Sequence, residues 1–128
     1  MATTYIGPGE TVDYANAGSA ISSGDVVVMG AATTGGCCVG IALTDIAATT
    51  GVGAVAITGV FTMTKKSAAV ILQGDTVNWD ASTSDVDDNA ATAATGDVEN
   101  FGIATEAAGN GVVTVNVKLM PGLGTKSA

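Results

Sequence analysis

The chain has 128 residues and a net charge of −8, with 12 acidic residues, four lysines and no histidine or arginine. So few basic residues argue against a nucleic-acid surface or an anchor on anionic membranes, both of which need clustered Lys or Arg. The absence of histidine excludes Ser-His-Asp and Cys-His nucleophile systems. The length predicts a single domain.

The hydrophobic content predicts a core of small side chains. Hydrophobic residues make up 47% of the chain, but aromatic residues only 4%. Each small side chain contributes little when buried, at about 25 cal/mol per Å² of apolar surface. We therefore expect the domain to gain stability from partners.

Short β-branched runs bounded by glycines predict seven or more strands. In chain order they are residues 11–15, 25–30, 38–43, 53–64, 75–80, 101–107 and 111–119. This number of short strands is typical of an all-β sandwich or small barrel. The last run alternates, which places Val113, Val115, Val117 and Leu119 on one face.

Two phrases of the sequence recur. ISSGDVVVM at 21–29 and ILQGDTVNW at 71–79 share the pattern I-x-x-G-D-x-V-x-(large apolar), and Gly-Ile-Ala occurs at both 40–42 and 102–104. The glycine can adopt positive φ before the strand, and the aspartate can close the turn through side-chain-to-backbone hydrogen bonds. An internal pseudo-repeat is therefore expected.

These runs predict the domain organisation. Residues 1–10 are expected as an extended N-terminal arm and residues 121–128 as a flexible tail. Residues 11–120 are expected as a single β domain, with pseudo-repeat halves at about 20–64 and 70–119.

The long segment 80–100 is polar and acidic, and we do not expect it to pack tightly. Its aspartates lack the glycine and glutamate that a calcium loop requires. The tail PGLGTKSA does not match a phosphate loop, because Thr125 separates Gly124 from Lys126.

Four further residues are interpreted as structural. The adjacent Cys37 and Cys38 are expected as small strand residues, and Lys65 and Lys66 as a solvated strand end. No catalytic, cofactor or metal site is expected, which favours a structural or binding module over an enzyme.

The ordered set of runs resembles a family of tailed-phage proteins, the capsid cement or head decoration proteins, formerly labelled recombinase-like. The resemblance covers roughly residues 4–119, and the runs that carry it are YIGPGETVDY, AISSGDVV, VGIA, ITGVFTMTK, GDTVNWD and FGIA…VNVKL. The recombinase label finds no support, since a phosphate loop is missing.

The resemblance implies a non-enzymatic virion protein without a cofactor, made in the bacterial host cytoplasm and bound to the outer surface of the capsid. Its implied partners are the major capsid protein, whose subunit contacts it stabilises, and itself, as a homotrimer. Its implied fold is a small β-barrel or β-tulip-like sandwich. The alternative is a β-rich phage fibre or adhesin-type module that binds a ligand.

Two sets of contact residues follow as hypotheses. The expected capsid contacts lie in the arm and are Thr4, Tyr5, Ile6 and Pro8. The expected trimer contacts are Trp79 and Phe61, and the alternative for Trp79 is a place in the core near a strand end. The arm could add a strand to an edge of a capsid sheet.

Overall fold

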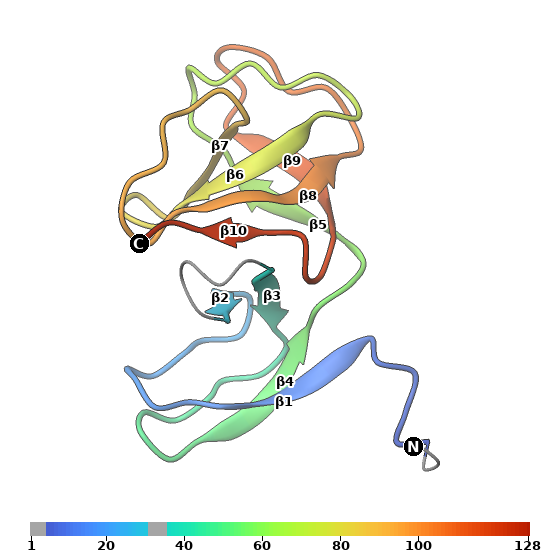
Figure 1. Cartoon of the computed structure of the whole chain (residues 1–128), viewed down its shortest axis with the longest axis vertical. Coiled ribbons are helices and arrows are strands. Elements are labelled where there is room, and N and C mark those ends of the chain that lie inside the picture. The colour runs from blue at the N-terminus through green and yellow to red at the C-terminus, as the bar shows by residue number, and fades with distance from the viewer. Residues whose placement is uncertain (1–4, 31–35) are drawn as a thin grey trace.

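Short runs of β-branched residues form strands throughout the computed structural model, which describes residues 5–30 and 36–128 (Figure 1). The strands are β1 (Thr11–Ala15), β2 (Val26–Met29), β3 (Cys38–Ala42), β4 (Val52–Ala56), β5 (Val60–Thr64), β6 (Thr76–Asp80), β7 (Asp85–Asp88), β8 (Val98–Ala104), β9 (Thr114–Leu119) and β10 (Thr125–Lys126). No helix that is long and apolar enough to span a membrane occurs in these two ranges. The all-β prediction is confirmed for the described residues.

The strands form two antiparallel sheets, which Figure 1 shows one above the other. The first sheet has the order β1-β4-β3-β2 and the second the order β5-β9-β8-β6-β7, with β10 paired to β8. An isolated β-bridge links the two sheets between Cys37, just before β3, and Gly124, just before β10. In it the backbone N–H of Cys37 donates to the carbonyl of Gly124 at 2.7 Å. The arrangement is sandwich-like.

The second sheet curls without closing into a barrel in the part of the chain that the structure describes. Its outer strands β5 and β7 are linked by an isolated bridge between Lys65 and Val86, next to which the Lys66 N–H donates to the Val86 carbonyl at 3.0 Å. A closed barrel needs a ladder between its first and last strands. The predicted barrel is therefore not found, and the β-tulip variant stays a prediction.

The sheets share one strand order and register. β1-β4-β3-β2, here called the first unit, corresponds to β5-β9-β8-β6, the second unit. Val26 pairs with Ile41 in the first unit as Thr76 pairs with Ile103 in the second. Strand β5 pairs within the second sheet, so these units do not follow the sequence halves 20–64 and 70–119.

The two I-x-x-G-D turns have the same hydrogen bonds. The Ser22 N–H donates to Asp25 Oδ2 at 2.9 Å, and the Leu72 N–H donates to Asp75 Oδ2 at 3.0 Å. The glycines inside these turns have φ of 93° and 89°. Positive φ and a side-chain acceptor explain why both phrases contain Gly-Asp.

The core has two parts. The larger cluster joins Val39 and Ile41 of β3 to the second sheet, where Phe101 is its largest fully buried side chain. The smaller cluster lies on the other face of the first sheet and includes Val27 and Val55. Side chains of β2 alternate between the two clusters, so the continuous VVVM run is apolar on both faces.

Two regions pack more closely than expected. Segment 80–100 contains β7, whose Val86 is fully buried, so the expectation of a loosely packed loop is wrong there. The C-terminal segment, expected as a flexible tail, forms β10 against β8, and the Ser127 N–H donates to the Asp97 carbonyl at 2.8 Å. Backbone pairing makes both segments part of the sheet.

Alternation in the last long strand is confirmed with one exception. Val115, Val117 and Leu119 are buried, as predicted. Val113 is exposed, because β9 begins at Thr114 and the preceding residue belongs to a loop.

Candidate functional site

The N-terminal arm presents apolar side chains to solvent. Tyr5 is 80% and Ile6 92% exposed, and Pro8 is also exposed. The fourth arm candidate, Thr4, lies outside the described residues. Large exposed apolar side chains on an extended segment are typical of a contact surface.

The arm continues into β1, which is an outer strand of the first sheet. The register of β1 runs from Thr11 opposite Ala56 to Ala15 opposite Val52, so one of its edges is used by β4. The other edge pairs with no strand among the described residues. The arm could be predicted from the sequence but this free edge could not, since strand order is set by pairings between residues distant in sequence.

The structure brings Phe61 and Trp79 to one cleft of about 590 Å³ between the sheets. Val26 and Ile41 line it from the first sheet, and Thr64 and Ser84 border it as polar groups. Trp79 is 7% exposed and belongs to the larger core cluster, whereas Phe61 is partly buried. Phe61 therefore offers more surface to a partner than Trp79 does.

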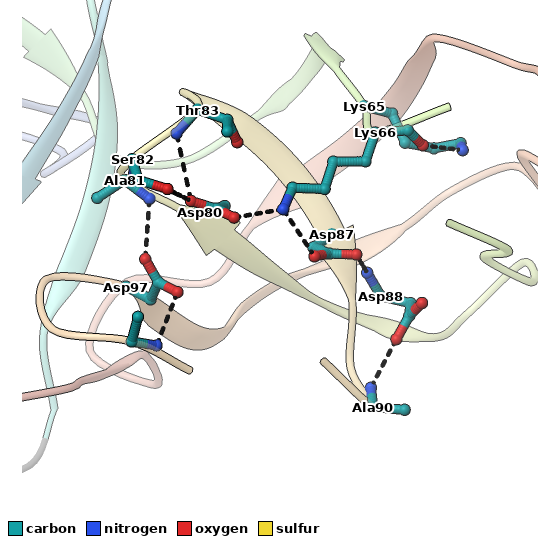
Figure 2. Close-up of polar contacts among 11 residues, drawn as sticks. Lys65, Lys66, Asp80, Ala81, Ser82, Thr83, Asp87, Asp88, Ala90 and Asp97 are labelled. Atoms are coloured by element: carbon teal, nitrogen blue, oxygen red, sulfur yellow. Dashed lines mark hydrogen bonds and ion pairs between the residues drawn. The ribbon is translucent and has the colours of Figure 1, made fainter. Parts of the chain in front are cut away.

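Lys66 ties the end of β5 to strands β6 and β7 (Figure 2). Its ammonium contacts the Asp80 carboxylate directly and lies 3.4 Å from Asp87 Oδ2. The hydrogen bond from Lys66, reinforced by the Ser82 hydroxyl, holds the pKa of Asp80 below its usual range. The same hydrogen bond raises the pKa of Lys66. This network links three strands, which is a structural role.

Lys65 is buried, so its expected place at a solvated strand end is wrong. Its ammonium donates to the carbonyls of Lys66, at 2.6 Å, and of Ser67 and Ala69. All three acceptors are backbone carbonyls of the turn that follows, so the Lys65 ammonium is fixed in place and has a structural role.

Aspartates in segment 80–100 stabilise turns. Asp97 accepts hydrogen bonds from the N–H of Ala81 at 3.0 Å and from the N–H of Ala94 at 2.9 Å (Figure 2). Asp88 accepts one from the Ala90 N–H at 2.9 Å. Within residues 5–30 and 36–128, no group of three or more His, Cys, Asp or Glu side chains is placed to hold a metal ion.

The two cysteines are free thiols, Cys37 buried and Cys38 half-buried. Burial raises the pKa of both thiols. A raised pKa lowers the thiolate fraction at neutral pH and with it the reactivity of the side chain. Both residues therefore fit the structural interpretation made from the sequence.

The comparisons with known proteins agree with the resemblance described above. A family model described as phage cement protein matches residues 6–119. Searches of curated proteins and of solved structures gave no match. The matched range contains the exposed Ile6, the outer strand β1 and every strand from β1 to β9. The chain therefore belongs to the phage cement protein family.

Proposed function

We propose that this chain is a non-enzymatic cement protein on the outer surface of a phage head. There it binds the major capsid protein and stabilises contacts between its subunits, after synthesis in the bacterial host cytoplasm. The observation that carries the proposal is the family match over residues 6–119. The exposed apolar arm supports it, because its side chains provide a surface that can bind the capsid.

The arm and the free edge of β1 together suit binding by strand addition. A neighbouring capsid strand would pair with backbone groups, while Tyr5, Ile6 and Pro8 would fill apolar pockets. Full burial of one large aliphatic side chain such as Ile6 contributes about 1.5–3 kcal/mol. Repetition over several linked copies multiplies this modest affinity.

A homotrimer, with Phe61 and Trp79 at its seam, remains part of this proposal. Phe61 supports it better than Trp79, because more of its side chain stays accessible at the cleft. The same cleft is the feature that favours the second candidate, a fibre or adhesin-type module. In that case Phe61→Ala would abolish ligand binding while decoration of heads would be absent even in the unaltered chain.

Deleting residues 1–9 tests the arm. Glu10 is retained because its carbonyl accepts the Ile57 N–H at 3.1 Å, so the domain should remain folded. We expect the truncated protein to fail to co-sediment with purified undecorated heads, and electron microscopy to show bare shells.

A matched variant separates the arm from general loss of apolar surface. Ile6→Ser should weaken head binding by about tenfold or more, since one buried aliphatic side chain is lost. Leu123→Ser removes an exposed apolar side chain elsewhere and should leave binding unchanged. Normal decoration by the truncated protein would contradict the role of the arm.

A further inference from the structure

The end of the second sheet that lies away from the first sheet carries exposed apolar side chains. They are Val70 (54% exposed), Leu72 (61%), Val112 (44%) and Val113 (59%), here called the apical patch. The two loops that contain them cross the upper end of the molecule in Figure 1. In a small monomer, such a group of apolar side chains on one surface indicates a contact site.

Backbone hydrogen bonds hold the two loops side by side. Ile71 and Ala108 exchange N–H···O bonds of 2.9 and 2.8 Å, and the Gly111 N–H donates to the Ser67 carbonyl at 2.7 Å. Ile71 and Ala108 are buried, while Val70 and Leu72 on either side of Ile71 are exposed, as are Val112 and Val113 next to the Gly111 contact. The patch is therefore a built surface on paired backbone.

The first unit contains the same backbone arrangement. Ile21 and Ile46 exchange N–H···O bonds as Ile71 and Ala108 do, and the Asn16 N–H donates to the Gly51 carbonyl as the Lys65 N–H donates to the Val113 carbonyl. These bonds define which positions correspond. The residues at the positions of Val70, Leu72, Val112 and Val113 are Ala20, Ser22, Thr50 and Gly51.

This correspondence provides an internal control. The same turns form in the first unit with small or polar residues, so the backbone does not require large apolar ones. The exposed parts of the four apolar side chains at the equivalent end of the second unit carry a hydration cost that packing inside the chain does not offset. A contact outside the chain accounts for them.

The distribution of charge favours one kind of partner. Segments 67–73 and 108–113 contain no charged residue, whereas the whole chain carries −8. Copies of the chain repel one another across their acidic surfaces, and this repulsion is weakest where the charge is absent. A basic partner would instead be drawn to the carboxylates. We propose that the apical patch is a contact surface between copies of this chain.

The apical patch is then the surface through which the proposed homotrimer assembles, and this role rests on the proposed function. Four side chains form a smaller area than the roughly 800 Å² per partner of a standard interface. We therefore expect weak association in solution, with a dissociation constant between about 10 µM and 1 mM. Neighbouring sites on a shell would raise the effective concentration and strengthen the contact.

The test transplants residues of the first unit into the second. The variant Val70→Ala/Leu72→Ser/Val112→Thr carries side chains that the equivalent backbone already accommodates. Sedimentation equilibrium of the purified chain should show an average mass that rises above 12.3 kDa with concentration. In the triple variant the association should weaken at least tenfold.

A matched control removes the same residue types elsewhere. Val52→Ala/Leu123→Ser/Val60→Thr alters exposed side chains outside the patch and should associate like the unaltered chain. Phe61→Ala instead removes the seam residue proposed above, which lies at the cleft between the sheets. Loss of association in either variant, with the apical variant unaffected, would overturn the proposal.

A second measurement needs no substitution. Hydrogen exchange of the unaltered chain at low and high concentration should show added protection in segments 67–73 and 108–113. Protection confined to another region, or a monomeric mass at about 1 mM, would refute the proposal. So would an apical variant that self-associates normally but no longer decorates heads, since the patch would then bind the capsid. Head binding by the arm truncation tests the proposed function separately.

Discussion

The tight approach of β8 to β9 makes Gly102 a position where one added methyl group should be costly. A Cβ atom there would lie 2.5 Å from the Lys118 carbonyl oxygen and 2.8 Å from Val117 Cγ1. Ordinary contacts of this kind begin at 3.4 Å, so the strands would need about 0.9 Å of additional separation. The nearer obstacle is backbone, which cannot move away by changing a rotamer.

The expected cost of Gly102→Ala follows from these distances. Overpacking of this kind costs about 1–3 kcal/mol. Separation of the strands also weakens neighbouring hydrogen bonds, such as that from Met120 N–H to the Phe101 carbonyl at 3.1 Å, each worth about 0.5–1.5 kcal/mol. Reduced entropy of the unfolded chain returns about 0.4–1 kcal/mol. Taking the middle of each range, we expect a net loss of about 2 kcal/mol in the free energy of unfolding.

Urea denaturation followed by tryptophan fluorescence measures this loss, because the single tryptophan lies in the adjacent strand β6. Gly109→Ala is the matched control, since a Cβ atom at that glycine meets nothing within 4 Å. Its effect should stay within about 0.5 kcal/mol, apart from the small entropic gain. A Gly102→Ala protein as stable as the control would refute the packing argument.

Two lysines give the remaining predictions. Lys66→Met removes a partly exposed ion pair and should cost about 0.5–1 kcal/mol at pH 7. Because the folded pKa of Asp80 is depressed, this contribution is present above the unfolded value of about 4 and is lost progressively as pH falls below it. The difference between variant and unaltered chain in urea titrations should therefore narrow towards low pH; a difference independent of pH would contradict the ion pair. Lys65→Met should cost about 1–3 kcal/mol in the same assay, since buried carbonyls lose their donor, and unchanged stability would show that water replaces the ammonium.

The alternation of side chains in the sequence predicted burial correctly along the last long strand. It predicted burial less well where burial depends on segments distant in sequence. The alternation of Val115, Val117 and Leu119 was sufficient to assign a buried face. Val113 fits the same alternation but lies beyond the strand, where the Lys65 N–H binds its carbonyl. That contact joins residues 48 positions apart, which no local pattern contains.

The two lysines show the same limit at the candidate sites. Adjacent positions 65 and 66 look alike in sequence, yet one ammonium is buried among carbonyls and the other pairs with aspartates on β6 and β7. The sequence predicted an extended arm over residues 1–10, and residues 5–8 of it are exposed. The free edge of β1 and the apical patch appear only once strand order and loop pairing are known.

The sequence alone determined that this protein is all-β, that Gly-Asp turns precede two of its strands, and that it resembles phage cement proteins. These features depend on local backbone preferences and on the order of short runs, and both follow from the amino-acid sequence without knowledge of the fold. Only the tertiary structure decided that the second sheet curls without closing, that Lys65 is buried, and that one unit carries an apolar end while the other does not. These properties arise from pairings between distant segments, and the free energy of such pairings depends on which surfaces meet.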